Sequence, residues 1–238
     1  MARPGYDRAF AASIAVSAGV LGPLIPPSIA FVIWGIVAEQ SIGRLFLSGI
    51  VPGLALAAGL LVMCWVHAKR NRVPKLPRAT LAETWSAFHR GKWALLSPAI
   101  VLGGIYGGVF TPTEAAAISC LYALIIGLFV ERQLTWRGLP DIFAEAMKTS
   151  AIVCAIIAVA NRFGVDPIHF GAIIVTNVAI GMAAPPIGYC LFIGMAISGL
   201  SLARISRAIW PQILVMLAVL FLTTYIPEFA LMLQPKGR

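Results

Sequence analysis

Long apolar stretches alternate with short polar ones along this 238-residue chain, and two of the apolar stretches contain a proline pair. Because about 20 apolar residues cross a bilayer as a helix, the pattern predicts seven membrane crossings. They lie near residues 9–38, 45–67, 93–110, 112–130, 140–160, 167–198 and 208–226. The first and the sixth contain the proline pairs and are predicted to be broken helices. The predicted fold class is therefore all-α, a polytopic integral membrane protein.

The proline pairs lie in the segments 22–28 and 181–188. A proline lacks the amide hydrogen and clashes with the preceding turn, so each pair should leave unpaired backbone groups at mid-depth in the membrane. Interrupted helices at corresponding places in two halves of a chain are typical of the binding sites of inverted-repeat transporters. Prolines also kink membrane helices that bind nothing, and this alternative stays open.

The two breaks supply the candidate binding residues. Carbonyls at the end of a half-helix suit a small cation, and amides at the start of the next half suit an anion. Neutral oxygen ligands favour sodium over a transition metal, with the backbone of Gly22, Pro26, Gly181 and Pro185 as possible ligands. The full set of candidates is Gly22, Pro23, Pro26, Pro27, Ser28, Thr176, Asn177, Gly181, Pro185, Pro186 and Gly188.

Composition supports a membrane protein, since 60% of the residues are hydrophobic and only 11% are charged. The net charge of +9 is carried by short loops, which indicates membrane orientation and argues against nucleic-acid binding. If the basic loop 69–78 is cytoplasmic, all but four of the 18 Lys and Arg fall on that side. The exceptions are Arg44, Arg162, Lys236 and Arg238. The two broken segments then cross in opposite directions, as an inverted repeat requires.

The polar stretch 69–92 divides the chain into three predicted parts. Residues 1–68 form the end of a first repeat, 69–92 a basic cytoplasmic connector, and 93–238 an incomplete second repeat with its broken helix at 167–198. Within the connector, apolar residues recur at helical spacing and predict an amphipathic helix at the membrane surface. A solvated connector is the alternative.

Local signals predict helix ends and helix contacts. Thr111 and Glu114 have the spacing of a capping box around Pro112 at the first helical position, and Asp166-Pro167 has the form of an N-cap followed by a first helical residue. Capping is the structural interpretation of Thr111 and Glu114; proximity to a transport route is the functional one. The segment 103–108 contains two overlapped G-x-x-x-G pairs, which predict close approach of another helix.

The chain offers little for catalysis. Its carboxylates lie at segment ends, with Glu145 nearest to an interior position, and its cysteines show no C-x-x-C spacing. His67, His89 and His169 lie near segment boundaries and are interpreted as interfacial residues. Because no nucleophile, phosphate-loop, haem or zinc motif is present, neither an enzyme nor an organic cofactor is predicted.

Five segments, in order, resemble the large permease subunit of tripartite ATP-independent periplasmic (TRAP) transporters. They are 19–28, 39–43, 108–117, 164–171 and 177–188. The resemblance implies a multi-pass protein of the bacterial inner membrane with inverted repeats and an elevator mechanism. It also implies sodium-driven symport of organic acids, a periplasmic substrate-binding protein and a small four-helix membrane subunit as partners.

The chain departs from the family pattern in two places. A re-entrant hairpin with ion ligands is expected before Met1, and a further stretch is expected near residues 160–164, where a deletion is predicted. An inactive, truncated permease that serves only as a membrane binding or scaffold module is therefore the alternative function. The substrate is not predicted, since specificity in this family is implied to lie largely in the separate binding protein.

Overall fold

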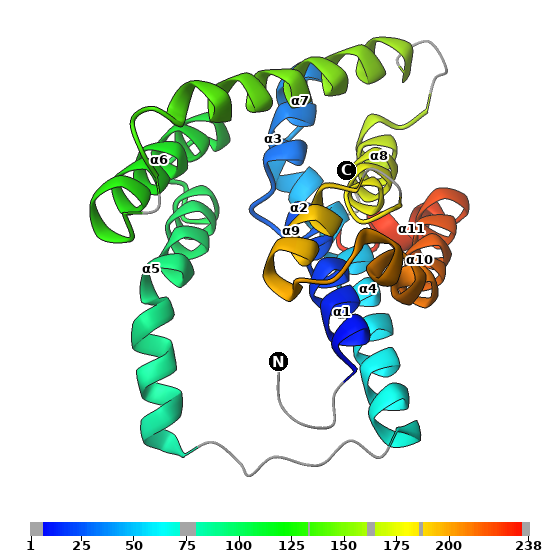
Figure 1. Ribbon diagram of the computed structural model, residues 1–238. Helices are drawn as coiled ribbons and strands as arrows, with labels where there is room; N and C mark the ends of the chain where they lie inside the picture. Colours follow the sequence, from blue (N-terminus) through cyan, green and yellow to red (C-terminus); the bar gives the residue numbers. More distant parts are fainter. Residues whose placement is uncertain (1–6, 72–79, 133, 161–164, 186–187, 235–238) are drawn as a thin grey trace. The chain divides into compact units, whose positions relative to one another are not determined.

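The computed structural model of the chain describes residues 7–71, 80–132, 134–160, 165–185 and 188–234, and these form helices joined by turns. The helices divide into two compact units (Figure 1). The first, the break unit, comprises Met1–Ser28, Arg44–Lys75 and Asp166–Arg238. The second, the middle unit, comprises Ile29–Gly43 and Leu76–Val165. These units are defined by contacts, so the predicted repeat boundaries stay a prediction.

The break unit contains both proline pairs and the long helix that follows the first of them. Its helices are α1 (Arg8–Gly19), α2 (Leu21–Leu24), α4 (Ile42–Arg70), α8 (Pro167–Gly181), α9 (Tyr189–Ser198), α10 (Leu202–Tyr225) and α11 (Pro227–Leu231). Helix α1 packs against α9 and α10, and α8 packs against α2 and α10. One apolar core joins them, with Leu24, Leu191, Ile205 and Met216 completely buried.

The middle unit is built from α3 (Ile29–Val37), α5 (Leu81–Tyr106), α6 (Pro112–Ile125), which continues as the π-helical turn η1 (Ile126–Val130), and α7 (Leu139–Ala160). Helix α5 starts with a capping box in which Thr80 accepts from the Glu83 amide and the Glu83 carboxylate accepts from the Thr80 amide. These bonds from the backbone and the hydroxyl of Thr80 hold the pKa of Glu83 below its ordinary value. The predicted amphipathic segment is thus the first part of one helix that continues through the predicted crossing at 93–110.

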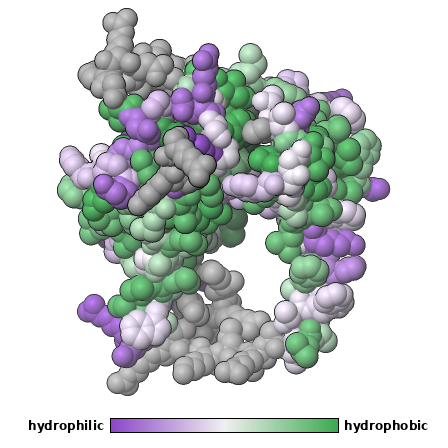
Figure 2. Space-filling model, turned by 180° about the vertical axis from the view of Figure 1, so that it is seen from behind, coloured by the Kyte–Doolittle hydropathy of each residue, from purple (hydrophilic) through white to green (hydrophobic). Residues whose placement is uncertain are grey.

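Within the described residues, four helical stretches are long and apolar enough to cross a membrane: Arg8–Val37, Ile42–Arg70, Thr113–Val130 and Leu202–Tyr225. They coincide with four of the seven predicted crossings. The predicted crossing at 167–198 is present as two shorter apolar helices, α8 and α9. Helix α4 exposes Leu54, Leu61 and Trp65, each with more than half of its surface accessible, and Figure 2 shows apolar side chains covering much of the visible surface. Such a surface suits a lipid environment.

The predicted caps are confirmed, whereas the predicted glycine interface is wrong. Thr111 and Glu114 exchange side-chain and backbone hydrogen bonds ahead of α6, with Pro112 as its first residue. Helix α5 already ends at Tyr106, so Gly107 and Gly108 lie in the turn beyond it, and Gly108 has a φ of +68°. The ring of Phe110 folds back onto Gly104, where a Cβ would meet it. Gly107 and Gly108 therefore form a tight turn, Gly104 packs against Phe110, and within the described residues no other helix meets these glycines.

Candidate functional site

Both proline pairs interrupt helices at the predicted places. In the first segment, α1 and the single turn α2 end at Leu24, residues 25–28 are non-helical, and α3 starts at Ile29. In the second, α8 ends at Gly181 and α9 starts at Tyr189. The prediction of two broken helices is confirmed.

The first break leaves carbonyl groups without the amide that a continuous helix provides. The amide of Ile25 still donates to the carbonyl of Leu21, at 2.9 Å. The next two residues, Pro26 and Pro27, have no amide hydrogen, so they donate nothing to the carbonyls of Gly22 and Pro23. The peptide bond between the two prolines is cis. This stretch therefore presents backbone oxygens of the kind that a small cation binds.

The second break is a compact backbone loop. The amides of Ala183 and Ala184 donate to Ile180 and Gly181 over three residues, which tightens the end of α8. The amide of Cys190 then donates to the carbonyl of Met182 at 2.8 Å and ties the start of α9 to the loop. A Cβ at Gly188 would lie within 2.9 Å of the backbone of 182–184, so only glycine fits there.

Within the break unit, α1 and α2 of the first broken segment pack against the second broken segment in the opposite direction. Near the breaks, a Cβ at Gly19 on α1 would lie 3.3 Å from the Sγ atom of Cys190 on α9. At the far end, Arg8 and Ala11 of α1 share a cavity with Ile197 of α9. Since the start of one helix meets the end of the other, α1 and α9 are antiparallel. The halves α2 and α8 also pack together, which brings the two breaks into one unit.

The candidate residues at the breaks divide into a buried and an exposed set. Ser28 and Thr176 are buried, and the Thr176 hydroxyl donates to the carbonyl of Ala172 at 2.7 Å. Asn177 and Gly181 are exposed and lie one turn apart on the same face of α8. The structure therefore places Thr176 and Asn177 on different sides of the helix, although they are neighbours in sequence.

The remaining candidates differ in how accessible their backbone is. Gly22 is exposed, and a Cβ there or at Gly181 would meet no other atom within 4 Å. Pro26, Pro27 and Pro185 are half-buried. Pro186 lies outside the described residues. Open space at both glycines leaves room for a ligand to approach the backbone of each break.

The start of α8 is fixed by two groups. The Asp166 carboxylate accepts from the amides of Ile168 and His169 at 2.9 and 2.8 Å, which confirms the predicted N-cap. His169 is predicted to lie near the membrane interface; its ring is buried within the unit, and its Nε2 atom lies 2.7 Å from the carbonyl oxygen of Thr223. That carbonyl is among the last four of α10, which have no partner within their helix.

Sequence reasoning also missed two buried serines of α1. Ser13 and Ser17 are four residues apart and share one helix face, a spacing that is visible in the sequence. The Ser13 hydroxyl lies 2.9 Å from the side-chain amide of Gln212 on α10. Among the described residues, the Ser17 hydroxyl is buried without a hydrogen-bond partner. A buried hydroxyl without a partner is unusual, and this one lies in the last turns of α1, shortly before the first break.

Comparison with known proteins decides the family. The sequence model described as the DctM component of tripartite ATP-independent periplasmic transporters matches residues 1–162 and 156–229. The chain belongs to this family. It is thus a permease component of a membrane transport system and not an enzyme.

The relatives of this DctM-family chain are large permease proteins. It is 32% identical to the C4-dicarboxylate TRAP transporter large permease protein of Rhodobacter capsulatus, covering 98% of this chain and 70% of the relative. It is 30% identical to the sialic acid TRAP transporter large permease protein of Vibrio cholerae, covering 96% and 68%. The isethionate TRAP transporter permease protein of Oleidesulfovibrio alaskensis is 36% identical over 95% of this chain, which spans only 46% of that relative.

The comparison also supports the predicted internal deletion. The family model matches in two pieces that overlap at residues 156–162, a range that includes the start of the predicted position at 160–164. The alignment with the Rhodobacter capsulatus protein runs over 309 positions, more than the 238 residues of the chain. This DctM-family chain therefore lacks an internal stretch that its relatives possess.

Proposed function

We propose that this chain is the membrane permease subunit of a sodium-driven symporter for small organic acids. The observation that carries the proposal is that both Pro-Pro breaks lie in the break unit, where α1 of the first broken segment is antiparallel to α9 of the second. Their exposed backbone oxygens form a neutral ligand set that suits sodium. Within the described residues no three His, Cys, Asp or Glu are grouped as metal ligands, so the proposed site depends on backbone, hydroxyl and amide oxygens.

The names of the relatives support an organic anion as the substrate. They are permeases for C4-dicarboxylate, isethionate, sialic acid and 2,3-diketo-L-gulonate. The shared feature is a small polar molecule with an acidic group. In the proposed mechanism, amides at the start of a second half-helix receive that group, while carbonyls at the end of a first half-helix bind sodium.

Partner subunits follow from the tripartite system. We propose a periplasmic binding protein that delivers the substrate and a small four-helix membrane subunit that pairs with the permease. Two longer relatives, the isethionate permease protein DctMQ and the sialic acid permease protein SiaT, support a further membrane segment, because this chain spans only 46% of each. The proposed location is the bacterial inner membrane, with the inverted repeats moving as an elevator.

Transport assays with both partners test the proposal. The permease chain, the small subunit and the binding protein are reconstituted in vesicles, and uptake of each labelled organic acid is measured with and without an inward sodium gradient. We expect sodium-dependent uptake of at least one. Ser28→Ala or Asn177→Ala should raise the sodium concentration needed for half-maximal uptake about tenfold, the effect of losing roughly 1.4 kcal/mol of binding.

Matched control variants distinguish the loss of a sodium-binding group from a general effect of substitution on the protein. Thr224→Val removes a hydroxyl that donates to Leu220 within α10, and Asn71→Ala removes an amide that donates to His67 at the end of α4. Neither residue belongs to a break, so sodium dependence should be unchanged. Uptake that is equally fast without sodium would exclude the coupling mechanism.

The internal deletion supports a second candidate function, a binding or scaffold module. In that case the chain should copurify with the small membrane subunit and yet show no uptake under any gradient. Restoring the missing stretch from a relative at residues 160–164 should then produce transport. Absence of a complex with the small subunit would reject the scaffold function.

A further inference from the structure

A second candidate site lies at the end of the break unit opposite the breaks. Two cavities adjoin there, of about 430 and 520 Å³, and Arg8 lines both of them. Arg8 is the first residue of α1, whose 12 residues span about 18 Å, and α2 follows α1 before the first break begins. This end of the unit is therefore distinct from the proposed sodium site.

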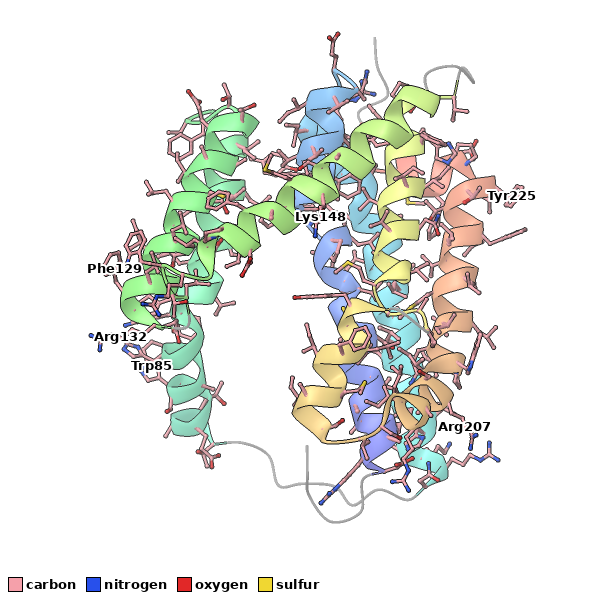
Figure 3. All side chains as sticks on the ribbon, turned by 45° about the horizontal axis from the view of Figure 1, so that its top comes forward. Trp85, Phe129, Arg132, Lys148, Arg207 and Tyr225 are labelled. Atoms are coloured by element: carbon pink, nitrogen blue, oxygen red, sulfur yellow. The ribbon has the colours of Figure 1, made fainter. Side chains whose placement is uncertain are left out.

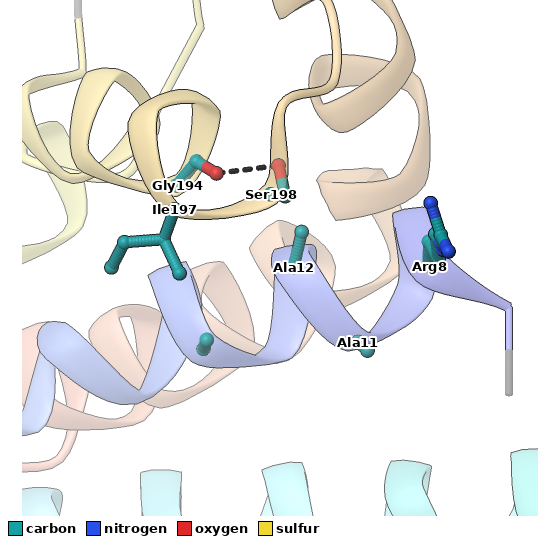
Figure 4. Close-up of a pocket in the computed structure, with 7 residues that line it drawn as sticks. Arg8, Ala11, Ala12, Gly194, Ile197 and Ser198 are labelled. Carbon is teal, nitrogen blue, oxygen red and sulfur yellow. Dashed lines mark hydrogen bonds between the residues drawn. The ribbon is translucent and has the colours of Figure 1, made fainter. Parts of the chain in front are cut away.

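The first cavity is an apolar groove between α1 and α9 (Figure 4). Ala11 and Ala15 line it from α1, one turn apart, and Ile197, 82% exposed, lines it from α9. The hydroxyl of Ser198 donates to the carbonyl of Gly194 at 2.6 Å, so both polar groups are already paired. At Gly194 a Cβ would clash with the side chain of Val16, which closes the groove toward the breaks. The groove thus offers a mainly apolar surface whose polar groups Ser198 and Gly194 are already hydrogen-bonded.

The second cavity is strongly basic. Arg8, Arg204 and Arg207 line it, with Asp7 as the one acidic residue among the described residues of its lining. The Asp7 carboxylate accepts from the Ala9 amide at 2.9 Å as the cap of α1. Arg204 and Arg207 lie three residues apart on α10, and Figure 3 shows Arg207 projecting from that end of the helix. Three guanidinium groups with a single carboxylate leave an excess of positive charge for an anion.

The start of α10 adds to this charge. Its N-cap residue, Ser201, makes no side-chain hydrogen bond to the first turn, so the positive end of the helix dipole is uncapped by a side chain. Guanidinium groups bind phosphate oxygens with paired, charge-assisted hydrogen bonds. A phosphate at Arg8 would lie directly beside the apolar groove, because Arg8 lines both cavities.

We propose that this end of the break unit binds an anionic phospholipid. The phosphate is held by Arg8, Arg204 and Arg207, and an acyl chain lies in the groove along Ala11, Ala15 and Ile197. Charge complementarity selects an anionic headgroup, and the continuous apolar groove selects a lipid over a soluble phosphate or carboxylate. Basic pockets beside apolar helix grooves recognise lipids in this way in membrane proteins generally.

Lipid binding to the purified full chain tests the proposal. The delipidated protein in detergent is titrated with phosphatidylglycerol, phosphatidylcholine or glycerol 3-phosphate, and bound species are counted by native mass spectrometry. We expect clear preference for phosphatidylglycerol and no binding of glycerol 3-phosphate. The double variant Arg204→Gln/Arg207→Gln should weaken phosphatidylglycerol binding about 30-fold, as expected for two arginines near a lipid phosphate.

Two further variants make the outcome decisive. Ala15→Phe fills the groove without changing charge and should also displace phosphatidylglycerol, whereas Arg132→Gln, which removes an exposed arginine of the middle unit, should leave binding unchanged. Helical circular dichroism of each variant confirms that it is folded. Equal affinity of the double variant and the unchanged chain for phosphatidylglycerol would overturn the proposal, as would equal binding of glycerol 3-phosphate.

Discussion

Gly188 illustrates how a single residue shapes the second break. Its backbone dihedrals, φ −56° and ψ 118°, are accessible to any residue, so conformational freedom is not the reason for glycine here. The reason is space, because the backbone of residues 182–184 occupies the position of a Cβ. Backbone atoms cannot move aside as a flexible side chain can. The glycine lets α9 start directly against the loop, where the amide of Cys190 reaches the carbonyl of Met182.

Replacing Gly188 by alanine should therefore open the second break. We expect Gly188→Ala to destabilise the protein by about 1–3 kcal/mol, the usual cost of overpacking a tight contact. Thermal unfolding of the purified chain in detergent measures the change. Gly91→Ala is the matched control, since a Cβ at Gly91 in α5 meets nothing within 4 Å, and its stability should be unchanged or slightly higher. Equal midpoints for both variants would contradict the steric argument.

At the scale of single elements, α8 is held at its start by local and distant contacts. Asp166 caps it with two backbone hydrogen bonds from within the same turn. His169 links it to the end of α10, 54 residues later in the chain. The first contact is local and visible in the sequence, whereas the second depends on which helices pack together. Holding the start of α8 in place also sets the direction of the helix, and therefore where the carbonyl groups of its last turn lie at the second break.

Removing either contact should destabilise α8. We expect Asp166→Ala to cost about 1 kcal/mol through the lost cap, and His169→Phe to cost about 1–3 kcal/mol through the unpaired carbonyl of Thr223. Chemical unfolding in mixed micelles measures both. Asp166→Asn keeps the capping oxygen and should retain most of the stability. His89→Phe changes an exposed histidine and should have no effect, so similar losses at both histidines would contradict the proposed role of His169.

The sequence allowed prediction of features that depend on a few neighbouring residues. The Pro-Pro breaks and the caps at Thr111 and Asp166 follow from missing amides and short side-chain oxygens, and each was found at the predicted residue. Tertiary contacts were harder to predict. Gly107 and Gly108 lie in a turn after α5, where Phe110 folds back onto Gly104, and Thr176 and Asn177 face different sides of α8. No periodicity in one segment specifies which face its packing partners will cover.

At the scale of the whole molecule, the crossing directions predicted from the loop charges can be compared with the directions in which the helices of the break unit pack. Loop charges predicted that the two broken segments cross in opposite directions, and α1 and α9 are antiparallel. Arg8 and Arg204 were predicted on the same side of the membrane, and they line one cavity. Two independent observations, charge along the sequence and contact in space, therefore agree on which ends of these helices share a side.

This agreement predicts the sidedness of two exposed serines in the intact cell membrane. In a chain whose four cysteines are replaced by alanine, Ser41→Cys lies after the first broken segment and Ser201→Cys lies after the second. If loop 69–78 is cytoplasmic, as the positive-inside rule predicts, a membrane-impermeant maleimide added outside should label Ser41→Cys. Ser201→Cys should react only after the membrane is permeabilised. Both positions are exposed serines in the folded chain, so a difference in reactivity reports membrane side and not burial. Labelling of both variants from outside would show that the two broken segments do not cross in opposite directions.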